Sequence, residues 1–527
     1  MASSAAVKRV DDQFAGARTI FEGFVGKLSD DNALSMTHDQ LEGLVAGEGR
    51  ELLRQLLEDH LQLRTVLEQK QAAVQGVDKV NRNHVRQRTV KMTTMVGAVD
   101  VTRLTYGARG TTSLVPADAQ LNMPAESFSF TVRERVAWLA SRMSFDDVVE
   151  EFQRAHGVML GKRQVEELAR RAAVDFDAYY AVRDQLAVGD PPASQSALPF
   201  LVLSTDAKGV VMLPDSLRAQ TQKRAKSATR KLKTRLSTGE KADRKRMAQV
   251  AAIYDVEPWV RRVDDILLLT RNVPDDRRPL PPRATNKRVW ASIEKDAVCV
   301  IAEAFNEGLR RDPEKKRPWA VLVDGNLSQL DTAKRCAKQV GVEPVIVLDV
   351  IHVIEYLWRA AFSFHLVGTP DAEEWVLSRL RSVLEGKAVD VAAGMRTSAT
   401  KRKLAGKKRD AVDATANYLL NHKQYLRYDE YLAAGLPIAT GVIEGACRHL
   451  VKDRMDITGA RWGLTGAEAI LRLRSLVASK DFDEYWAFHL EQEFKRNHGD
   501  HYAEPPAPVV LRPANYRRGA SHLRLVR

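Results

Sequence analysis

The spacing of apolar residues divides the N-terminal part of the chain into a helical region followed by a hairpin. From residue 10 to about residue 80, leucines recur at near-helical spacing among charged residues, and this predicts helices. From Arg88 to Tyr106 apolar and polar residues alternate instead, and Val96-Gly97 interrupts the alternation. A period of two broken by a turn predicts a β-hairpin at this place.

Between Phe130 and Ala173 the pattern predicts three short helices. Ser144, with Asp147 three residues on, forms a capping box that begins the second helix. His156-Gly157 ends it, and a third helix follows. A helix, a glycine-containing turn and a helix outline a helix-turn-helix, whose second helix presents its first residues to a major groove. Those residues are Lys162, Arg163 and Gln164. A generic helical bundle gives the same pattern and stays an alternative.

Beyond residue 199, short apolar segments alternate with helical ones. The pattern predicts strands at Pro199–Ser204, Met247–Tyr254 and Asp265–Thr270, a helix over Lys287–Leu309, a strand at Ala320–Val323, a helix over Leu327–Val340, a strand at Pro344–Leu348 and a helix over Ile351–Phe364. This order matches an α/β ribonuclease H-like core with a mixed five-stranded sheet. In such a sheet the first and fourth strands are neighbours.

These patterns divide the chain into consecutive regions. We expect a helical N-terminal region (1–80), a β-hairpin region (81–126), a helix-turn-helix DNA-binding region (127–176), a linker (177–198), the first part of the ribonuclease H-like core (199–370), an all-α, basic insertion (371–436), the last part of the core (437–480) and a basic C-terminal tail (481–527).

The charge of the chain favours a polyanionic partner. Its 527 residues carry a formal net charge of +13, and the basic residues are gathered in blocks. Three cysteines far apart in the sequence indicate neither a disulfide framework nor a zinc ribbon. The first residues lack the apolar segment of a signal peptide, and no apolar run is long enough to span a bilayer. We therefore expect a cytoplasmic protein without a membrane partner.

Three acidic residues at the edges of apolar segments are the main candidates for catalysis. Asp206 and Asp324 follow predicted strands, and Glu444 lies on a predicted helix. Each alone has an ordinary explanation, because Asp before Gly or Lys is common in turns and Glu444 can pair with Arg448. Together they form a set of carboxylates suited to two Mg²⁺ or Mn²⁺ ions per active site, which catalyse phosphodiester chemistry.

Asp349 and His352 begin the helix that follows the fifth predicted strand. They fall on one face of that helix, where they could brace the acidic site or contact the scissile strand. The alternative is that Asp349 caps the helix and His352 packs beside it. Asp349 also competes with Asp324 for the role of second metal ligand. We prefer Asp324, because its strand is the expected neighbour of the strand that carries Asp206.

Basic residues near the acids are candidates for DNA contact. Arg448 and Lys452 are spaced to lie on the helix face of Glu444, and Arg461 and Trp462 follow, with Trp462 offering a plane for an unpaired base. They could instead neutralise acids or pack in the core. Residues 217–246 hold twelve Lys and Arg against two acids, and residues 391–409 hold seven against none. From the first block we select Lys223, Arg224, Lys226, Arg230, Lys231 and Lys233 as phosphate contacts.

From about residue 199 to residue 480 the sequence resembles a DDE transposase of bacterial insertion sequences, in the Mutator-related branch with a helical insertion before the glutamate. Asp206, Asp324 and Glu444 match the triad, Asp349-x-x-His352 matches a Cys/Asp-x-x-His motif, and residues 439–448 match the glutamate segment. Relatives often carry paired cysteines after the hairpin, whereas residues 106–110 contain none. A zinc-stabilised hairpin is therefore not expected.

The resemblance implies an enzyme that binds the terminal inverted repeats of its own element, cleaves a phosphodiester at each end and transfers the 3′-hydroxyl to target DNA. It implies double-stranded DNA as partner, a homodimer or larger assembly, and a bacterial protein associated with the nucleoid. A ribonuclease H-like nuclease shares the triad and is one alternative. A domesticated DNA-binding protein without catalysis is another.

Overall fold

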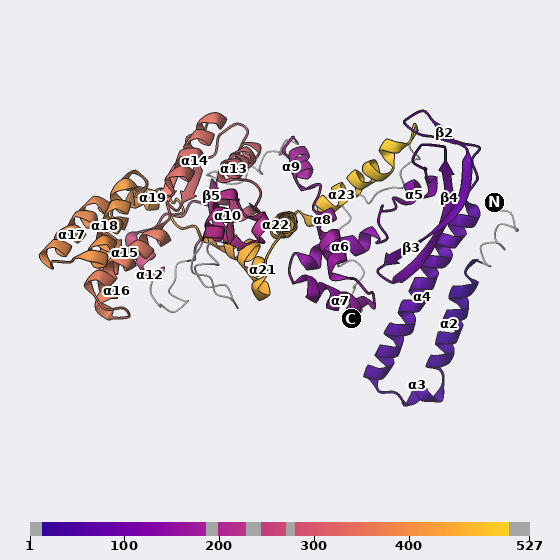
Figure 1. The fold of residues 1–527 in the computed structure, drawn as a ribbon. Coiled ribbons are helices and arrows are strands. Elements are labelled where there is room, and N and C mark those ends of the chain that lie inside the picture. Colours follow the sequence, from indigo (N-terminus) through magenta and orange to yellow (C-terminus); the bar gives the residue numbers. More distant parts are fainter. Residues whose placement is uncertain (1–12, 186–198, 228–243, 270–279, 505–527) are drawn as a thin grey trace. The chain divides into compact units, whose positions relative to one another are not determined.

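The computed structural model describes residues 13–185, 199–227, 244–269 and 280–504 (Figure 1). They form two compact units. Unit 1 contains the described residues up to Tyr179 and from Lys480 onward, and unit 2 contains those between them. In these ranges every helix is too short or too polar to cross a lipid bilayer.

Unit 1 begins with the predicted helices and hairpin, and both predictions are confirmed. The helices are α2 (Ala15–Leu28), α3 (Asp31–Ser35) and α4 (His38–Leu67), and a capping box of Thr37 with Gln40 begins α4. Strands β3 (His84–Thr94) and β4 (Gly97–Gly107) pair antiparallel around Met95-Val96, so the turn comes one residue earlier than predicted. A second, two-residue pairing joins β1 (Val74–Gln75) to β2 (Asn81–Arg82).

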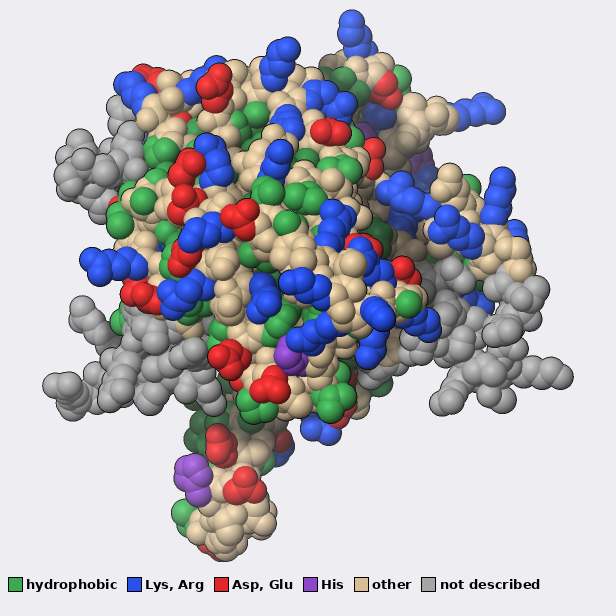
Figure 2. Space-filling model, turned by 90° about the vertical axis from the view of Figure 1, so that its left-hand side faces the viewer, with side chains coloured by type: hydrophobic (Ala, Val, Ile, Leu, Met, Phe, Trp, Pro, Cys, Tyr) green, Lys and Arg blue, Asp and Glu red, His purple; other side chains and the backbone are tan. Residues whose placement is uncertain are grey.

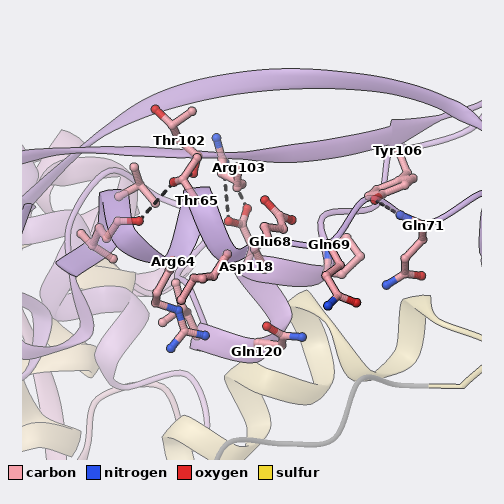
Figure 3. A pocket seen from close by; sticks show the side chains of 16 residues that line it. Arg64, Thr65, Glu68, Gln69, Gln71, Thr102, Arg103, Tyr106, Asp118 and Gln120 are labelled. Atoms are coloured by element: carbon pink, nitrogen blue, oxygen red, sulfur yellow. Dashed lines mark hydrogen bonds and ion pairs between the residues drawn. The ribbon is translucent and has the colours of Figure 1, made fainter. Parts of the chain in front are cut away.

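Helix α4 runs along β4 and caps the open edge of that strand (Figure 3). Glu58 accepts a hydrogen bond from the Asp100 amide at 3.2 Å, Thr65 donates to the Thr102 carbonyl, and Glu68 accepts from the Leu104 amide at 2.9 Å. A two-stranded ribbon is marginally stable alone, and these bonds satisfy alternate backbone groups of β4. A cavity of about 550 Å³ lies between α4, β4 and α5 (Pro116–Leu121).

The three short helices of the predicted helix-turn-helix are also confirmed in unit 1. They are α6 (Phe130–Ala140), α7 (Phe145–His156) and α8 (Lys162–Ala172), and α7 starts at the predicted capping box. Gly157 ends α7 with φ +63°, a left-handed conformation that suits glycine. Helix α9 (Phe176–Gln185) follows. Helix α23 (Phe482–Asn497) returns to this unit, where the Tyr485 hydroxyl donates to the Ala172 carbonyl.

Unit 2 is built on a five-stranded mixed sheet in the order β7-β6-β5-β8-β9. Its strands are β5 (Phe200–Val211), β6 (Lys245–Val256), β7 (Thr285–Ser292), β8 (Trp319–Val323) and β9 (Val345–Leu348). The first three pair antiparallel, and β5-β8 and β8-β9 pair parallel. The expected mixed five-stranded sheet is thus present, with the first and fourth strands adjacent. Most residues of β5, β6 and β8 are buried.

Two elements of unit 2 differ from the sequence prediction. Residues Val263–Leu269, part of the predicted third strand, form the short helix α12, and the third strand is instead β7, inside the predicted helix Lys287–Leu309. A short apolar run does not by itself distinguish strand from helix. Asp264 and Asp265 lie in the first turn of α12, where carboxylates favour a helix.

Helices flank the sheet and form the insertion. Between the strands lie α10 (Ala219–Ser227), α13 (Ala297–Arg311), α14 (Leu327–Val340) and α15 (Val350–Phe364). The predicted insertion is helical, with α16 (Pro370–Leu384), α17 (Ala388–Lys401), α18 (Gly406–Asn421) and α19 (Tyr428–Ala433), and it packs on α15 (Figure 1). The chain then continues through α20 (Gly441–Ala446), a π-helical turn (Cys447–Lys452), α21 (Asp453–Met455) and α22 (Leu464–Ser479).

Candidate active site

Three aspartates follow the carboxyl ends of the parallel strands of unit 2. The last parallel pair of β5 and β8 precedes Asp206 and Asp324 by two residues each. The last pair of β8 and β9 precedes Asp324 and Asp349 by one residue each. Since the register is continuous, the three residues lie at the same edge of adjacent strands. Asp206 marks the end of the parallel pairing rather than of its strand, because β5 continues against β6 to Val211.

Asp324 begins the turn that leads from β8 into α14. One of its carboxylate oxygens accepts a hydrogen bond from the Asn326 amide at 2.9 Å, and Asn326 in turn caps α14. Gly325 between them has φ +93°, which a residue with a side chain rarely adopts. The carboxylate is half-buried. Asp324 therefore serves the turn with one oxygen while its side chain lies at the acidic edge of the sheet.

Asp349 is fully buried and holds two elements together. Its carboxylate accepts hydrogen bonds from the Ile351 amide at 3.0 Å and from the Thr440 amide at 3.3 Å, and a short one from the Thr440 hydroxyl. The first bond caps α15, so the helix-capping interpretation is confirmed. Burial raises the pKa of Asp349 above its ordinary value although these bonds oppose the shift. The carboxylate thus ties the start of α15 to the segment before α20.

Glu444 reaches the same edge from α20, which packs on β5 and β6. Cys447 lies one helical turn beyond Glu444, and its thiol donates a hydrogen bond to the Asp206 carboxylate, with Sγ and Oδ2 3.1 Å apart. Burial, followed by the charge of Asp206, raises the pKa of this thiol, so it stays a donor. The contact anchors the helix of Glu444 to the first aspartate. Chain segments about 240 residues apart in sequence meet here.

The electrostatics of this edge favour a cation. Burial first, and then the negative charges of Asp349 and Asp206, raise the pKa of Glu444. Among the described residues, Asp206, Asp324, Asp349 and Glu444 form no ion pair with a lysine or arginine. Like-charged carboxylates without such partners repel one another, and hard oxygen ligands suit Mg²⁺ or Mn²⁺. The residues therefore fit a divalent cation in their chemistry.

The tightest set of possible metal ligands lies elsewhere, in unit 1. Within the described residues only Asp175, His489 and Glu493 bring their ligand atoms within 4.8 Å of one another, so the acids of unit 2 are more widely spaced. The unit 1 set is already paired, because Arg133 contacts Glu493 at 2.8 Å and Arg496 contacts Asp175 at 2.6 Å. Charge balance by arginine makes this cluster a buried ion network, which has no need of a metal.

His352 lies one helical turn after Asp349 and is half-buried. Its Nε2 atom is 4.0 Å from an Asp349 carboxylate oxygen, and its Nδ1 atom is 3.3 Å from the carboxylate of Glu355. The imidazole also lies near Glu444, where its charge opposes the rise in the pKa of that carboxyl. The structure therefore brings His352 to the acidic edge together with the predicted acids.

The basic residues after Glu444 occupy a different arrangement from the one expected. Residues 447–452 form a π-helical turn, so Arg448 and Lys452 do not continue the regular spacing from Glu444 that an α-helix would give. Arg448 pairs with Asp453 at 3.7 Å, and with its side chain 72% exposed it stays accessible to a ligand. Lys452 and Arg461 are exposed as well. These three cations lie on the surface close to the acids in sequence.

Trp462 does not offer a free plane for a base in this structure. Its side chain is only 6% exposed, its indole N–H donates to the Met455 carbonyl at 2.9 Å, and the Arg454 guanidinium lies 4.9 Å from its ring centroid. Its backbone also bridges to Met212 beyond β5. The expectation of base stacking is corrected accordingly: the ring fills the core where the Glu444 segment joins the sheet.

The described part of the first basic block forms an exposed helix. Lys223, Arg224 and Lys226 are exposed on α10, which follows β5. Arg230, Lys231 and Lys233 lie outside the described residues. Arg246 is drawn inward, since its guanidinium donates to the Ile293 carbonyl at 2.8 Å.

In the insertion, lysines of the second basic block are exposed between α17 and α18, whereas Arg396 and Arg409 pair with Asp413. Figure 2 shows this side of unit 2 with blue lysine and arginine side chains interspersed with red acidic ones. The insertion therefore presents a mixed surface in which only part of the cationic charge is left unpaired by acids.

In unit 1 the residues expected to read DNA open α8 and are exposed. Lys162 pairs with Asp146 at 2.6 Å, and both side chains are more than half exposed, so the pair contributes little to stability. The Gln164 side chain accepts a hydrogen bond from the Gly161 amide at 2.8 Å and thereby closes the start of the helix. Arg163 is exposed beside them. The first turn of α8 is accessible to a ligand.

Three residues important to the site were not among those predicted. Cys447 follows Glu444 by three residues, a helical spacing that could have indicated a shared face. Thr440, which bonds Asp349, gives no signal in the sequence, because its partner lies 91 residues away. The same holds for Tyr418, whose hydroxyl donates to the Asp324 carbonyl at 2.8 Å.

Comparison with known proteins adds no relative. A scan against models of protein families gives no match, and a search of curated proteins finds no significant similarity. Function is therefore inferred from the residues and from their geometry.

Proposed function

We propose that the protein is a DDE transposase of a bacterial insertion sequence, with a ribonuclease H-like core and a helical insertion before the catalytic glutamate. The sheet order β7-β6-β5-β8-β9, antiparallel on one side of β5 and parallel on the other, supports this core. The observation that carries the proposal is the convergence of strand-end aspartates with the helix of Glu444, linked by the contact between Cys447 and Asp206.

The proposed reaction is metal-dependent phosphodiester cleavage followed by strand transfer. Asp206, Asp324 and Glu444 would hold two Mg²⁺ or Mn²⁺ ions, which together activate the attacking hydroxyl and stabilise the leaving oxygen. The Cys447 thiol orients the Asp206 carboxylate, and the bonds between Asp349 and Thr440 fix the start of α20. The first step is hydrolysis at the end of the element, and the second transfers the freed 3′-hydroxyl to a target phosphodiester.

Double-stranded DNA is the proposed partner, at the terminal repeats and at the target. The exposed first turn of α8 suits base contacts, and the exposed cations of α10, Arg448, Lys452 and Arg461 suit phosphate contacts. We also propose a homodimer or larger assembly, because pairing two ends requires it. Exposed Phe21 on α2 and Leu53 on α4 supply apolar surface for such a contact. A nucleoid-associated location follows from the DNA partner.

Incubation with DNA carrying the sequences that flank the gene tests the proposal. The full-length protein should cut at the end of a repeat only with Mg²⁺ or Mn²⁺ present. Asp206→Ala, Asp324→Ala and Glu444→Ala should each abolish cutting and leave DNA binding unchanged, since loss of a ligand disables metal-assisted displacement. Asp331→Ala, an exposed acid on α14, is the matched control and should cut normally. Cutting by all three variants would refute the proposal.

The pH dependence gives an independent check. A metal binds the deprotonated carboxylate, and the pKa of Glu444 is raised by burial and by Asp349. Binding of Mn²⁺ to the wild-type protein should therefore strengthen as the pH rises through a value above that of an ordinary glutamate. Isothermal titration calorimetry at several pH values measures this, and constant affinity from pH 4.5 upward would contradict the proposed role of Glu444.

A further inference from the structure

Helices α18 and α19 of the insertion donate hydrogen bonds to the ends of the strands that carry the acids. The Tyr418 hydroxyl donates to the Asp324 carbonyl at 2.8 Å, and the Tyr428 hydroxyl donates to the Leu348 carbonyl at 2.7 Å. The Nε2 atom of His422 lies 2.8 Å from the Gly325 carbonyl oxygen. All three acceptors belong to, or lie directly beside, a residue of the acidic edge.

These contacts are buried and closely fitted. Tyr428 is fully buried, and burial raises the pKa of the Tyr418 hydroxyl, so both stay donors. The Tyr418 ring stacks on Tyr356 of α15 with centroids 3.9 Å apart. A Cβ atom on Gly325 would lie 3.1 Å from the Tyr418 side chain, so the left-handed glycine also permits this close approach.

A carbonyl held by a buried donor restricts the rotation of its peptide. At Asp324 the restricted peptide joins it to Gly325, which fixes the backbone from which the Asp324 carboxylate projects. At Leu348 the restricted peptide is the one that leads into Asp349. Groups that orient metal ligands in this way typically change metal affinity or activity about 10–100-fold when they are removed.

We infer that Tyr418, His422 and Tyr428 are positioning residues for the acidic site, and that the insertion orients Asp324 and Asp349 for metal binding. The inference rests on the proposed function. It assigns to the insertion a task inside the catalytic unit in addition to any surface contact with DNA. The Tyr418 hydroxyl acts through the Asp324 backbone and touches neither metal nor substrate.

Calorimetric titration of Mn²⁺ into full-length protein tests the inference without relying on activity. Tyr418→Phe removes one hydroxyl and keeps the stacked ring, and Tyr428→Phe removes the other. Each variant should bind Mn²⁺ about 10–100-fold more weakly than the wild type. Tyr431→Phe is the matched control, because its hydroxyl donates at 3.3 Å to Ile346, inside β9 and away from the acids. Its Mn²⁺ affinity should equal that of the wild type.

Cleavage assays add a second measurement. In Tyr418→Phe the Mn²⁺ concentration for half-maximal cutting should rise, and saturating Mn²⁺ should restore the wild-type rate, whereas a variant that merely unfolds would not recover. Wild-type Mn²⁺ affinity in folded Tyr418→Phe and Tyr428→Phe would overturn the inference alone. Absence of Mn²⁺ binding by the wild type would overturn the proposed function itself, so the two failures are distinguishable.

Discussion

Replacing Asp324 and Asp349 separately should distinguish the metal ligand from the structural clamp. Asp349→Ala removes the acceptor for three buried donors, namely the Ile351 amide and the amide and hydroxyl of Thr440. A buried donor left unpaired costs about 1–3 kcal/mol. Loss of the desolvated carboxylate, whose pKa burial raises, offsets part of this sum. We expect a net destabilisation of about 3 kcal/mol, a large share of the roughly 5–15 kcal/mol that stabilises a typical protein.

Asp324→Ala should behave in the opposite way. Its half-buried carboxylate accepts only the Asn326 amide among the described hydrogen bonds, so stability should fall by about 1 kcal/mol. Because we propose it as a metal ligand, Mg²⁺-dependent cleavage should disappear although the protein stays folded. Asp349→Ala should retain cleavage at a temperature where circular dichroism shows native helix content.

The assay combines urea unfolding, followed by circular dichroism, with cleavage of repeat DNA at fixed Mg²⁺. Thr440→Val is the control for the clamp, because it removes the hydroxyl that bonds Asp349 and leaves every acid in place. It should lower stability by less than Asp349→Ala does. If Asp324→Ala cleaves at the wild-type rate while folded Asp349→Ala does not, the second metal ligand is Asp349 and our assignment is wrong.

Three further predictions concern DNA binding and stability. Alanine at the first three residues of α8 should reduce discrimination between repeat and random DNA, by about 1–3 kcal/mol for each side chain that reads a base edge, measured by competition binding. Glutamine at the three cations of α10 should weaken binding to every sequence and flatten the salt dependence by about 0.9 in logarithmic slope for each phosphate that a cation neutralises, so an unchanged slope would refute that role. Glu307→Gln should destabilise by about 3–5 kcal/mol at neutral pH, because the fully buried Glu307 pairs with four arginines. Since the arginines hold its pKa below the ordinary value despite burial, urea midpoints of variant and wild type should converge as the pH falls below about 4.5.

Local signals in the sequence determined most of the secondary structure and the identity of the candidate acids. The capping box at Ser144 and the glycine at 157 begin and end α7 as predicted, and the change to a period of two marks the ribbon of β3 and β4. Such signals depend on residues a few positions apart, so they survive in any fold. The order of elements then implied a mixed sheet with β5 beside β8, which brings Asp206 and Asp324 to one edge.

The same signals failed where two local structures suit one apolar run. The third strand was predicted near residue 265, whereas the sheet uses Thr285–Ser292. An apolar segment of this length can be buried as a helix or as a strand, and its neighbours in space decide between them. In β7 the backbone pairs with β6, and the side chain of Ser475 on α22 accepts from the Ala291 amide.

Only the tertiary structure decided how the candidate site is held. The bonds from Cys447 to Asp206, from Thr440 to Asp349 and from Tyr418 to the Asp324 carbonyl join residues 91 to 241 positions apart. Trp462, expected on the surface, fills the core by the same kind of contact. A polar pair of this kind leaves no periodic trace in either segment. It exists because the sheet register and the docking of the insertion bring a donor and an acceptor within hydrogen-bonding distance, where burial excludes water as an alternative partner.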